Sequence, residues 1–162
     1  MDPRGWTLNE YRCVYRTGSA TIEGMEVRRL RKGDEDVVAR LATSKPQTAL
    51  LEDEGTIFLV AFDDERAPIG FVFGYELPRR HGDPSILFVY EIDVDVASRR
   101  QGIAARLLRE LAQIARARGI ETGFVLTNAS NAAAMRLYES VGGTRPNDDD
   151  VVMWDFEWSA VR

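Results

Sequence analysis

The sequence has few of the residues on which metal sites and nucleophilic triads depend. Its 162 residues include a single cysteine, Cys13, and a single histidine, His81. One cysteine excludes an intrachain disulfide and a multi-cysteine metal site, and one histidine excludes a histidine-rich metal site. We interpret His81, which lies in the polar stretch 79–84, as a solvated loop residue. We therefore expect no metal, and a Ser-His-Asp triad only if His81 serves it.

Long apolar runs and a basic surplus are also lacking. No apolar run is long enough to span a bilayer, and residues 1–10 lack the apolar core of a signal peptide. We therefore expect a cytoplasmic protein without membrane contact. The 21 Lys and Arg against 26 Asp and Glu give a formal net charge of −5, which argues against nucleic acid as a partner. The acidic balance either attracts a small cationic substrate or serves solubility alone.

The chain length suits one domain with a single core. Residues 1–24 show no sustained hydrophobic period, so we interpret them as an N-terminal extension that is disordered, a start-site artefact or a lid, and we favour the first two. Residues 25–162 are predicted to form the domain. The sequence leaves open whether two copies form a homodimer.

Hydrophobic periodicity predicts a mixed α/β domain. Strands are predicted at 26–30, 56–62, 69–76, 86–96, 122–127 and 151–158, and helices begin near Asp34, Ala49, Ile103 and Asn131. Short hairpins make the first strands antiparallel, whereas a strand-helix-strand crossover makes the strands at Tyr90 and Val125 parallel.

The turn at residues 98–104 joins an apolar strand to a helix and favours an anion. The first amides of a helix have no intrahelical partner, and the helix dipole adds about half a positive charge there. Gly102 allows close approach of a phosphate, and Arg99 and Arg100 add charge, although adjacent arginines at a turn are often only solvated. The spacing matches neither a P-loop nor a three-glycine dinucleotide motif.

Two segments together carry a resemblance to a known family. Residues 99–104, Arg-Arg-Gln-Gly-Ile-Ala, resemble the pyrophosphate loop Gln/Arg-x-x-Gly-x-Gly/Ala of the GNAT N-acetyltransferase superfamily. Residues 131–142 resemble its later helix, which runs Asn-x-x-Ala-x-x-Leu-Tyr and ends in glycine. The resemblance implies a mostly antiparallel sheet with a splayed parallel pair, helices on both faces, and acetyl-CoA as cosubstrate.

A closer resemblance covers residues 75–104, which are similar to type I aminoglycoside 3-N-acetyltransferases through Tyr75 to Arg79, Tyr90-Glu91 and the loop. It implies an aminoglycoside acceptor, acetylated at the 3-amino group, and a role in antibiotic resistance. The region between the first two strands is shorter than in those enzymes, so acceptor identity stays open. The alternatives are another small amine, a protein N-terminus, or a CoA-binding module without turnover.

The superfamily resemblance also implies cofactor contacts. Backbone groups near Val94 and Val96 would pair with pantetheine like an added strand, and Asn131 would hydrogen-bond the cofactor. The residue types also predict that Asn131 or Ser130 caps this helix, and the two roles of Asn131 are compatible. The pyrophosphate contacts would come from the loop residues Arg99, Arg100, Gln101, Gly102, Ile103 and Ala104. A backbone amide, for example that of Val94, would stabilise the oxyanion.

Acetyl transfer to an amine also requires a base and a proton donor. Glu91 is our first candidate for the base; without a bulge it would share a face with Asp93 and Asp95, as a plain solvated face would too. Tyr138 matches the tyrosine that protonates the thiolate, although it also fits an apolar stripe and a core role. Candidate acceptor contacts are Tyr75, Glu76 and Tyr90, for which an edge-strand or core role is equally simple. Asp150 and Asp155 are further candidates for binding the substrate and reserves for the base, although a run of aspartates is usually a solvated loop.

Overall fold

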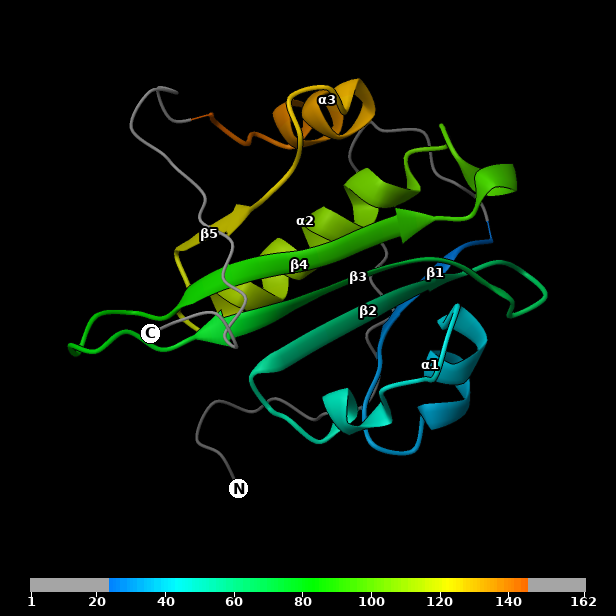
Figure 1. The fold of residues 1–162 in the computed structure, drawn as a ribbon, viewed down its shortest axis with the longest axis horizontal. Helices are drawn as coiled ribbons and strands as arrows, with labels where there is room; N and C mark the ends of the chain where they lie inside the picture. Colours follow the sequence, from blue (N-terminus) through cyan, green and yellow to red (C-terminus); the bar gives the residue numbers. More distant parts are fainter. Residues whose placement is uncertain (1–23, 146–162) are drawn as a thin grey trace, which may run out of the picture.

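The computed structural model describes residues 24–145, which form a five-stranded sheet in the order β1-β2-β3-β4-β5 (Figure 1). The strands are β1 (Glu26–Arg29), β2 (Thr56–Phe62), β3 (Pro68–Leu77), β4 (Ile86–Val94) and β5 (Thr122–Val125). Neighbouring strands are antiparallel from β1 to β4, and β4 and β5 are parallel. The predicted mixed, mostly antiparallel sheet is confirmed.

The predicted extension, apart from Gly24, and the predicted strand at 151–158 lie outside the described residues. Asp150 and Asp155 lie there too. The assignment of residues 25–162 to one domain stays a prediction.

Helices cover both faces of the sheet, as expected. They are α1 (Glu35–Leu41), α2 (Ile103–Ala117) and α3 (Ala132–Ser140), with short 3-10 helices at Thr48–Leu51 and Val96–Ser98. In Figure 1, α2 runs behind β4, whereas α1 lies near β1 and β2. Within residues 24–145, no helix combines the length and apolarity needed to cross a membrane.

Two hydrophobic clusters lie on opposite faces of β2, all seven residues of which are buried. On one face, Ile57 and Leu59 pack with Leu107 and Leu111 of α2. On the other, Phe58 and Val60 pack with a cluster that includes α1. The unbroken apolar run of β2 follows from this double coverage, because a strand buried on both faces has no polar side.

Glycines end both long helices in the same way. Gly119 and Gly142 have φ of 76° and 90°, a conformation that glycine adopts without steric cost. After α2, the Ile120 amide donates to the Ala115 carbonyl at 2.9 Å, and after α3 the Gly143 amide donates to Tyr138 at 2.9 Å. These bonds satisfy carbonyls that the helix ends would leave without partners.

The helix that begins near Asp34 starts without a side-chain cap from this residue. Asp34 stands at the N-cap of α1, but its carboxylate makes no side-chain bond to the helix amides. It instead accepts from Arg28 at 2.6 Å and from the Arg31 amide at 2.9 Å. The Arg28 guanidinium and the Arg31 backbone amide therefore take the place of the helix amides as partners of this carboxylate.

Candidate active site

The two parallel strands separate halfway along β4. Residues Ile86 to Val89 pair with Thr122 to Val125, and β4 then continues to Val94 without β5 beside it. The second half of β4 therefore has one edge that is not hydrogen-bonded to a strand within residues 24–145. An extended ligand can pair with such an edge through main-chain hydrogen bonds.

A β-bulge determines which side chains face this opening. Phe73 pairs with Glu91 and Gly74 pairs with Val89, so Tyr90 is the extra residue on β4. Residues opposite each other on paired strands share a face, and Phe73 belongs to the face that α1 covers. Glu91 therefore lies on that face, and so does Tyr90, whose ring contacts that of Phe73 at 5.2 Å.

Strand alternation without a bulge would have separated these two neighbours. Because the bulge precedes Glu91, the predicted shared face of Glu91 and Asp93 is retained: Asp93 pairs with Phe71, whose ring also belongs to the α1 face. Asp95 lies beyond the end of β4. Both Glu91 and Asp93 are exposed, but they differ in their contacts.

Asp93 is held by neighbouring groups of the chain. Its Oδ1 accepts from the Val94 amide at 2.8 Å and from Arg99 Nη2 at 3.2 Å. No hydrogen bond or ion pair joins Glu91 to another side chain within residues 24–145. Glu91 is thus the carboxylate of this pair that is available to a substrate.

The backbone of Val94 points toward the opening. The Asp95 amide donates to Ile69 at 2.9 Å, and Val94 pairs with Gly70, which makes Val94 and Gly70 a non-hydrogen-bonded pair. The N–H and C=O of Val94 therefore face away from β3. Arg99 Nε donates to this carbonyl at 2.8 Å, so both backbone groups of Val94 have partners from this chain.

Val96 lies off the strand, contrary to the predicted strand at 86–96. It begins the 3-10 helix Val96–Ser98, and its side chain is 73% exposed. The Asp95 carbonyl accepts from Ser98, which turns the chain out of the sheet before Val96 can extend β4. Its predicted contact with pantetheine stays a prediction.

The loop before α2 has the geometry expected of an anion site. Arg100 and Gly102 have φ of 63° and 81°, and a Cβ at Gly102 would meet nothing within 4 Å. The first helical bond joins the Arg106 amide to the Gly102 carbonyl. Within residues 24–145, the amides of Ile103 and Ala104 have no backbone partner, as at any helix start.

The six predicted loop residues contribute in different ways. Gln101, Arg99 and Arg100 are exposed. The Ile103 side chain is 1% exposed and belongs to the core below α2, and Ala104 packs against the same core, so both can offer only backbone amides to a ligand. The loop can therefore hold a diphosphate through amides and the two arginines.

On α3, Asn131 caps the helix as predicted, because its side chain accepts from the Ala134 amide at 3.1 Å. Tyr138 is half-buried on this helix, which contacts α2. Desolvation by burial raises the pKa of Tyr138 above its ordinary value of 10.0. A tyrosine in this state keeps its proton, which suits a proton donor.

An aromatic surface adjoins Glu91. The Tyr75 and Tyr90 rings meet edge to face at 5.6 Å, and Phe88 stacks on Phe124 at 4.8 Å with the rings 9° apart. Tyr90 and Phe124 are 57% and 40% exposed. Burial, followed by Tyr90 and Asp53, raises the pKa of Tyr75. The structure thus brings Tyr75 and Tyr90 together beside Glu91 and adds Phe88 and Phe124, which only their strand pairing could have revealed.

Glu76 does not join this group. Its Oε2 lies 2.8 Å from Arg118, and the same guanidinium donates to the Glu54 carbonyl at 2.9 Å. Arg118 follows the C-terminal end of α2, a helix of 15 residues, about 22 Å from the loop at its start. Glu76 thus links β3 to the end of α2 in this structure, and its predicted contact with an acceptor stays a prediction.

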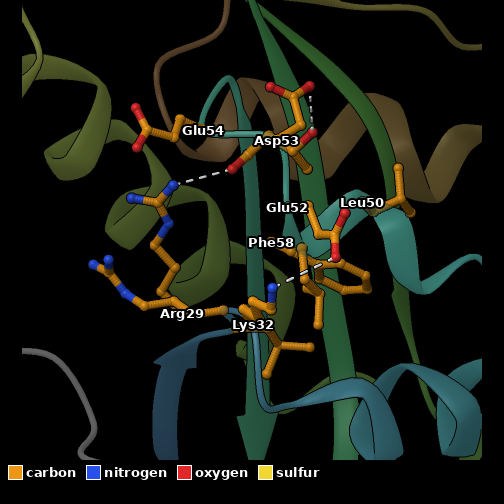
Figure 2. Close-up of a pocket in the computed structure, with 11 residues that line it drawn as sticks. Arg29, Lys32, Leu50, Glu52, Asp53, Glu54 and Phe58 are labelled. Atoms are coloured by element: carbon orange, nitrogen blue, oxygen red, sulfur yellow. Dashed lines mark hydrogen bonds and ion pairs between the residues drawn. The ribbon is translucent and has the colours of Figure 1, made fainter.

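A cavity of about 400 Å³ lies away from this site, between the end of β1 and the start of β2 (Figure 2). In Figure 2, Arg29 donates to the Thr56 carbonyl and Lys32 faces Glu52, 3.9 Å away. Acidic and basic side chains both line it, and none of the predicted site residues does.

Comparisons with known proteins agree with this geometry. Residues 23–143 match the family model described as the acetyltransferase (GNAT) family. L-2,4-diaminobutyric acid acetyltransferase of Streptomyces coelicolor is 36% identical over 87 residues, which cover 53% of this chain and 49% of that protein. The chain thus spans about half the length of this relative.

Two solved structures share the fold. An aminoglycoside acetyltransferase, meta-AAC0020 from an uncultured soil sample, has a TM-score of 0.73 at 21% identity and covers 84% of this chain and 99% of its own. AAC(6')-Iy, in complex with a CoA-linked bisubstrate analogue of acetylneamine, has a TM-score of 0.66 at 17% identity, covering 82% and 97%. Its designation names the 6' position rather than the 3-position that we expected. With its sheet, its splayed strands and the loop before α2, the chain belongs to the GNAT acetyltransferase family, whose cosubstrate is acetyl-CoA.

Proposed function

We propose that this GNAT acetyltransferase acetylates an amine of an aminoglycoside and so contributes to antibiotic resistance. The observation that carries the proposal is the position of Glu91, an exposed carboxylate beside Tyr90, in the half of β4 that pairs with no second strand on its β5 side within residues 24–145. A cationic amine is attracted to a carboxylate in a chain of net charge −5. The 3-amino group is the acceptor that the sequence resemblance indicates.

The residues of this chain supply the acid-base chemistry. Glu91 takes a proton from the ammonium, directly or through water, because only the neutral amine can attack a thioester. Acetyl-CoA supplies the acetyl group on a thiol leaving group. Tyr138, which keeps its proton because burial raises its pKa, donates to the departing thiolate. No covalent acetyl-enzyme is needed if both substrates are bound together.

The cofactor residues fit the same scheme. The amides of Ile103 and Ala104 and the side chains of Arg99 and Arg100 would hold the diphosphate beside Gly102. The edge of β4 at Val94, beyond its pairing with β5, would hold pantetheine once Asp93 and Arg99 release the Val94 backbone groups. Asn131 stands at the start of α3 with its carbonyl oxygen already used for capping, which leaves its NH₂ group for the cofactor.

A linear diamine is the second candidate acceptor. Its support is the named activity of the 36% identical relative, together with the short segment between β1 and β2, where the second helical piece is a single 3-10 turn, Thr48–Leu51. The third candidate function is a CoA-binding module without turnover, which would bind the cofactor but form no acetylated product.

The test is CoA release with a panel of amines at neutral pH. Kanamycin- and gentamicin-type aminoglycosides should release thiol with higher kcat/KM than diaminobutyrate, a polyamine or an N-terminal peptide. NMR of the product then assigns the acetylated nitrogen. Preference for a linear amine would overturn the aminoglycoside proposal, and cofactor binding without thiol release from any amine would support the binding module.

A further inference from the structure

We propose that Asp93 sets the affinity for the cofactor by competing with it for two groups, the Val94 amide and the Arg99 guanidinium. The inference rests on the proposed function, in which pantetheine pairs with Val94 and the diphosphate binds beside Arg99. Asp93 is a positioning residue in this scheme. It acts through its two partners.

Three hydrogen bonds join Asp93, Val94 and Arg99 at the edge of β4 that faces the opening. Asp93 Oδ1 accepts from the Val94 amide at 2.8 Å and from Arg99 Nη2 at 3.2 Å, while Arg99 Nε donates to the Val94 carbonyl at 2.8 Å. Together, Asp93 and Arg99 occupy the donor and the acceptor that Val94 presents toward the opening between β4 and β5. We call this set the Asp93 latch.

Pantetheine cannot pair with Val94 while the latch is closed, because an added strand needs the same N–H and C=O groups. The backbone itself is fixed by pairing with β3, since the Asp95 amide donates to Ile69 on the other edge. Side chains must therefore move. The Asp93 and Arg99 side chains are 59% and 54% exposed, so both have room to turn into solvent or toward a ligand.

The diphosphate offers Arg99 a better partner than Asp93. Arg99 lies five residues from Val94 and three before Gly102, at the start of the anion site. An exposed ion pair contributes little. A diphosphate carries more charge than one carboxylate, and the amides at the start of α2 also bind it. Binding thus exchanges the bonds of the latch for bonds to the cofactor, and the latch lowers the net affinity.

The experiment compares CoA affinity by calorimetry in the full chain and in two latch variants. Asp93→Ala removes both contacts and should tighten CoA binding about 3- to 10-fold, the amount expected from one exposed ion pair and one hydrogen bond. Asp93→Asn keeps an oxygen for the Val94 amide but loses the charge opposite Arg99. Its gain in CoA affinity should therefore be smaller than that of Asp93→Ala. Hydrogen exchange of the Val94 amide in the free protein should be faster in Asp93→Ala than in the wild type.

Asp95→Asn is the matched control, because Asp95 is an exposed acid two residues away and contacts neither Val94 nor Arg99 through its side chain. It removes the same charge near the diphosphate without touching the latch and should change affinity less than 2-fold. Equal effects of the Asp93 and Asp95 variants, or weaker binding in Asp93→Ala with unchanged melting temperature, would overturn the latch. Absence of CoA binding in the wild type would instead overturn the proposed cofactor site.

Discussion

Tyr90 and Glu91 are neighbours in the sequence, yet both project from the same face of the sheet. The bulge opposite Phe73 and Gly74 causes this, and it places the exposed Tyr90 ring beside the exposed carboxylate of Glu91. Bulges commonly redirect side chains next to active sites. The pair joins a candidate base to an apolar surface that can carry the rest of an acceptor.

Replacing Glu91 tests the base. Glu91→Gln should lower kcat about 10²- to 10⁴-fold, because an amide cannot take the proton of the ammonium. CoA affinity, measured by calorimetry, should stay within 2-fold of wild type, since no contact joins Glu91 to the loop at Gly102 in the described structure. Glu121→Gln removes an exposed acid just before β5 and serves as the control, with an unchanged rate. Full activity in Glu91→Gln would assign the base elsewhere.

Tyr138 should act as the proton donor over a wide pH range. Burial raises its pKa above 10.0, so the hydroxyl stays protonated at higher pH than a free tyrosine does. The wild-type rate should therefore show no alkaline loss from Tyr138 below about pH 10. Tyr138→Phe should lower kcat by about 10²-fold or more with little change in KM. An alkaline limb near pH 8 that disappears in Tyr138→Phe would contradict this assignment.

Periodic elements were predictable from the sequence, whereas contacts between distant or irregular segments were not. The helix at Ile103 and the strand at Thr56 follow from local apolar patterns, and the cap at Asn131 follows from its residue type at the start of a helix. The extra residue at Tyr90 depends on the register of β3 against β4, which single-strand periodicity does not contain.

The hydrogen-bond partners of the site side chains could not be predicted from the sequence either. Glu76 pairs with Arg118 across 42 residues, and Arg99 turns back to Asp93 and Val94. Nothing in a linear pattern states which of several partners a guanidinium will choose. The loop motif nevertheless located the turn at Gly102, because a positive φ there restricts the residue type strongly.

Arg100 is a non-glycine residue with φ of 63°, and this strain can be measured. Arg100→Gly should raise the free energy of unfolding by about 0.5–1 kcal/mol, since the left-handed conformation costs other residues roughly 1–2 kcal/mol and glycine loses part of that gain in the unfolded chain. It should also weaken CoA binding, because a cation beside the diphosphate is lost. Chemical denaturation and calorimetry measure the two effects.

Arg66 provides the matched control for Arg100. Its φ is 62°, and it lies in the turn between β2 and β3, outside the loop segment 99–104. Arg66→Gly should give a similar gain in stability with unchanged CoA affinity. If both variants weaken CoA binding equally, the effect belongs to net charge and Arg100 has no direct role at the loop.

The ring of Phe124 should contribute to the choice of acceptor. It stacks on Phe88, which meets Tyr90 edge to face at 5.8 Å, so the aromatic surface continues from Glu91 to β5. Phe124→Leu keeps an apolar side chain but removes the flat face. It should raise KM about 2- to 10-fold for amines carried on rings, the range expected for one aromatic contact, and leave KM for linear diamines unchanged. Leu77→Ala is the control, because Leu77 is an exposed apolar side chain on a different strand, β3. It should change KM for neither class of amine. An equal change in KM for ring-borne and linear amines would mean that Phe124 only supports the sheet. The choice of acceptor would then have to come from residues outside this aromatic surface.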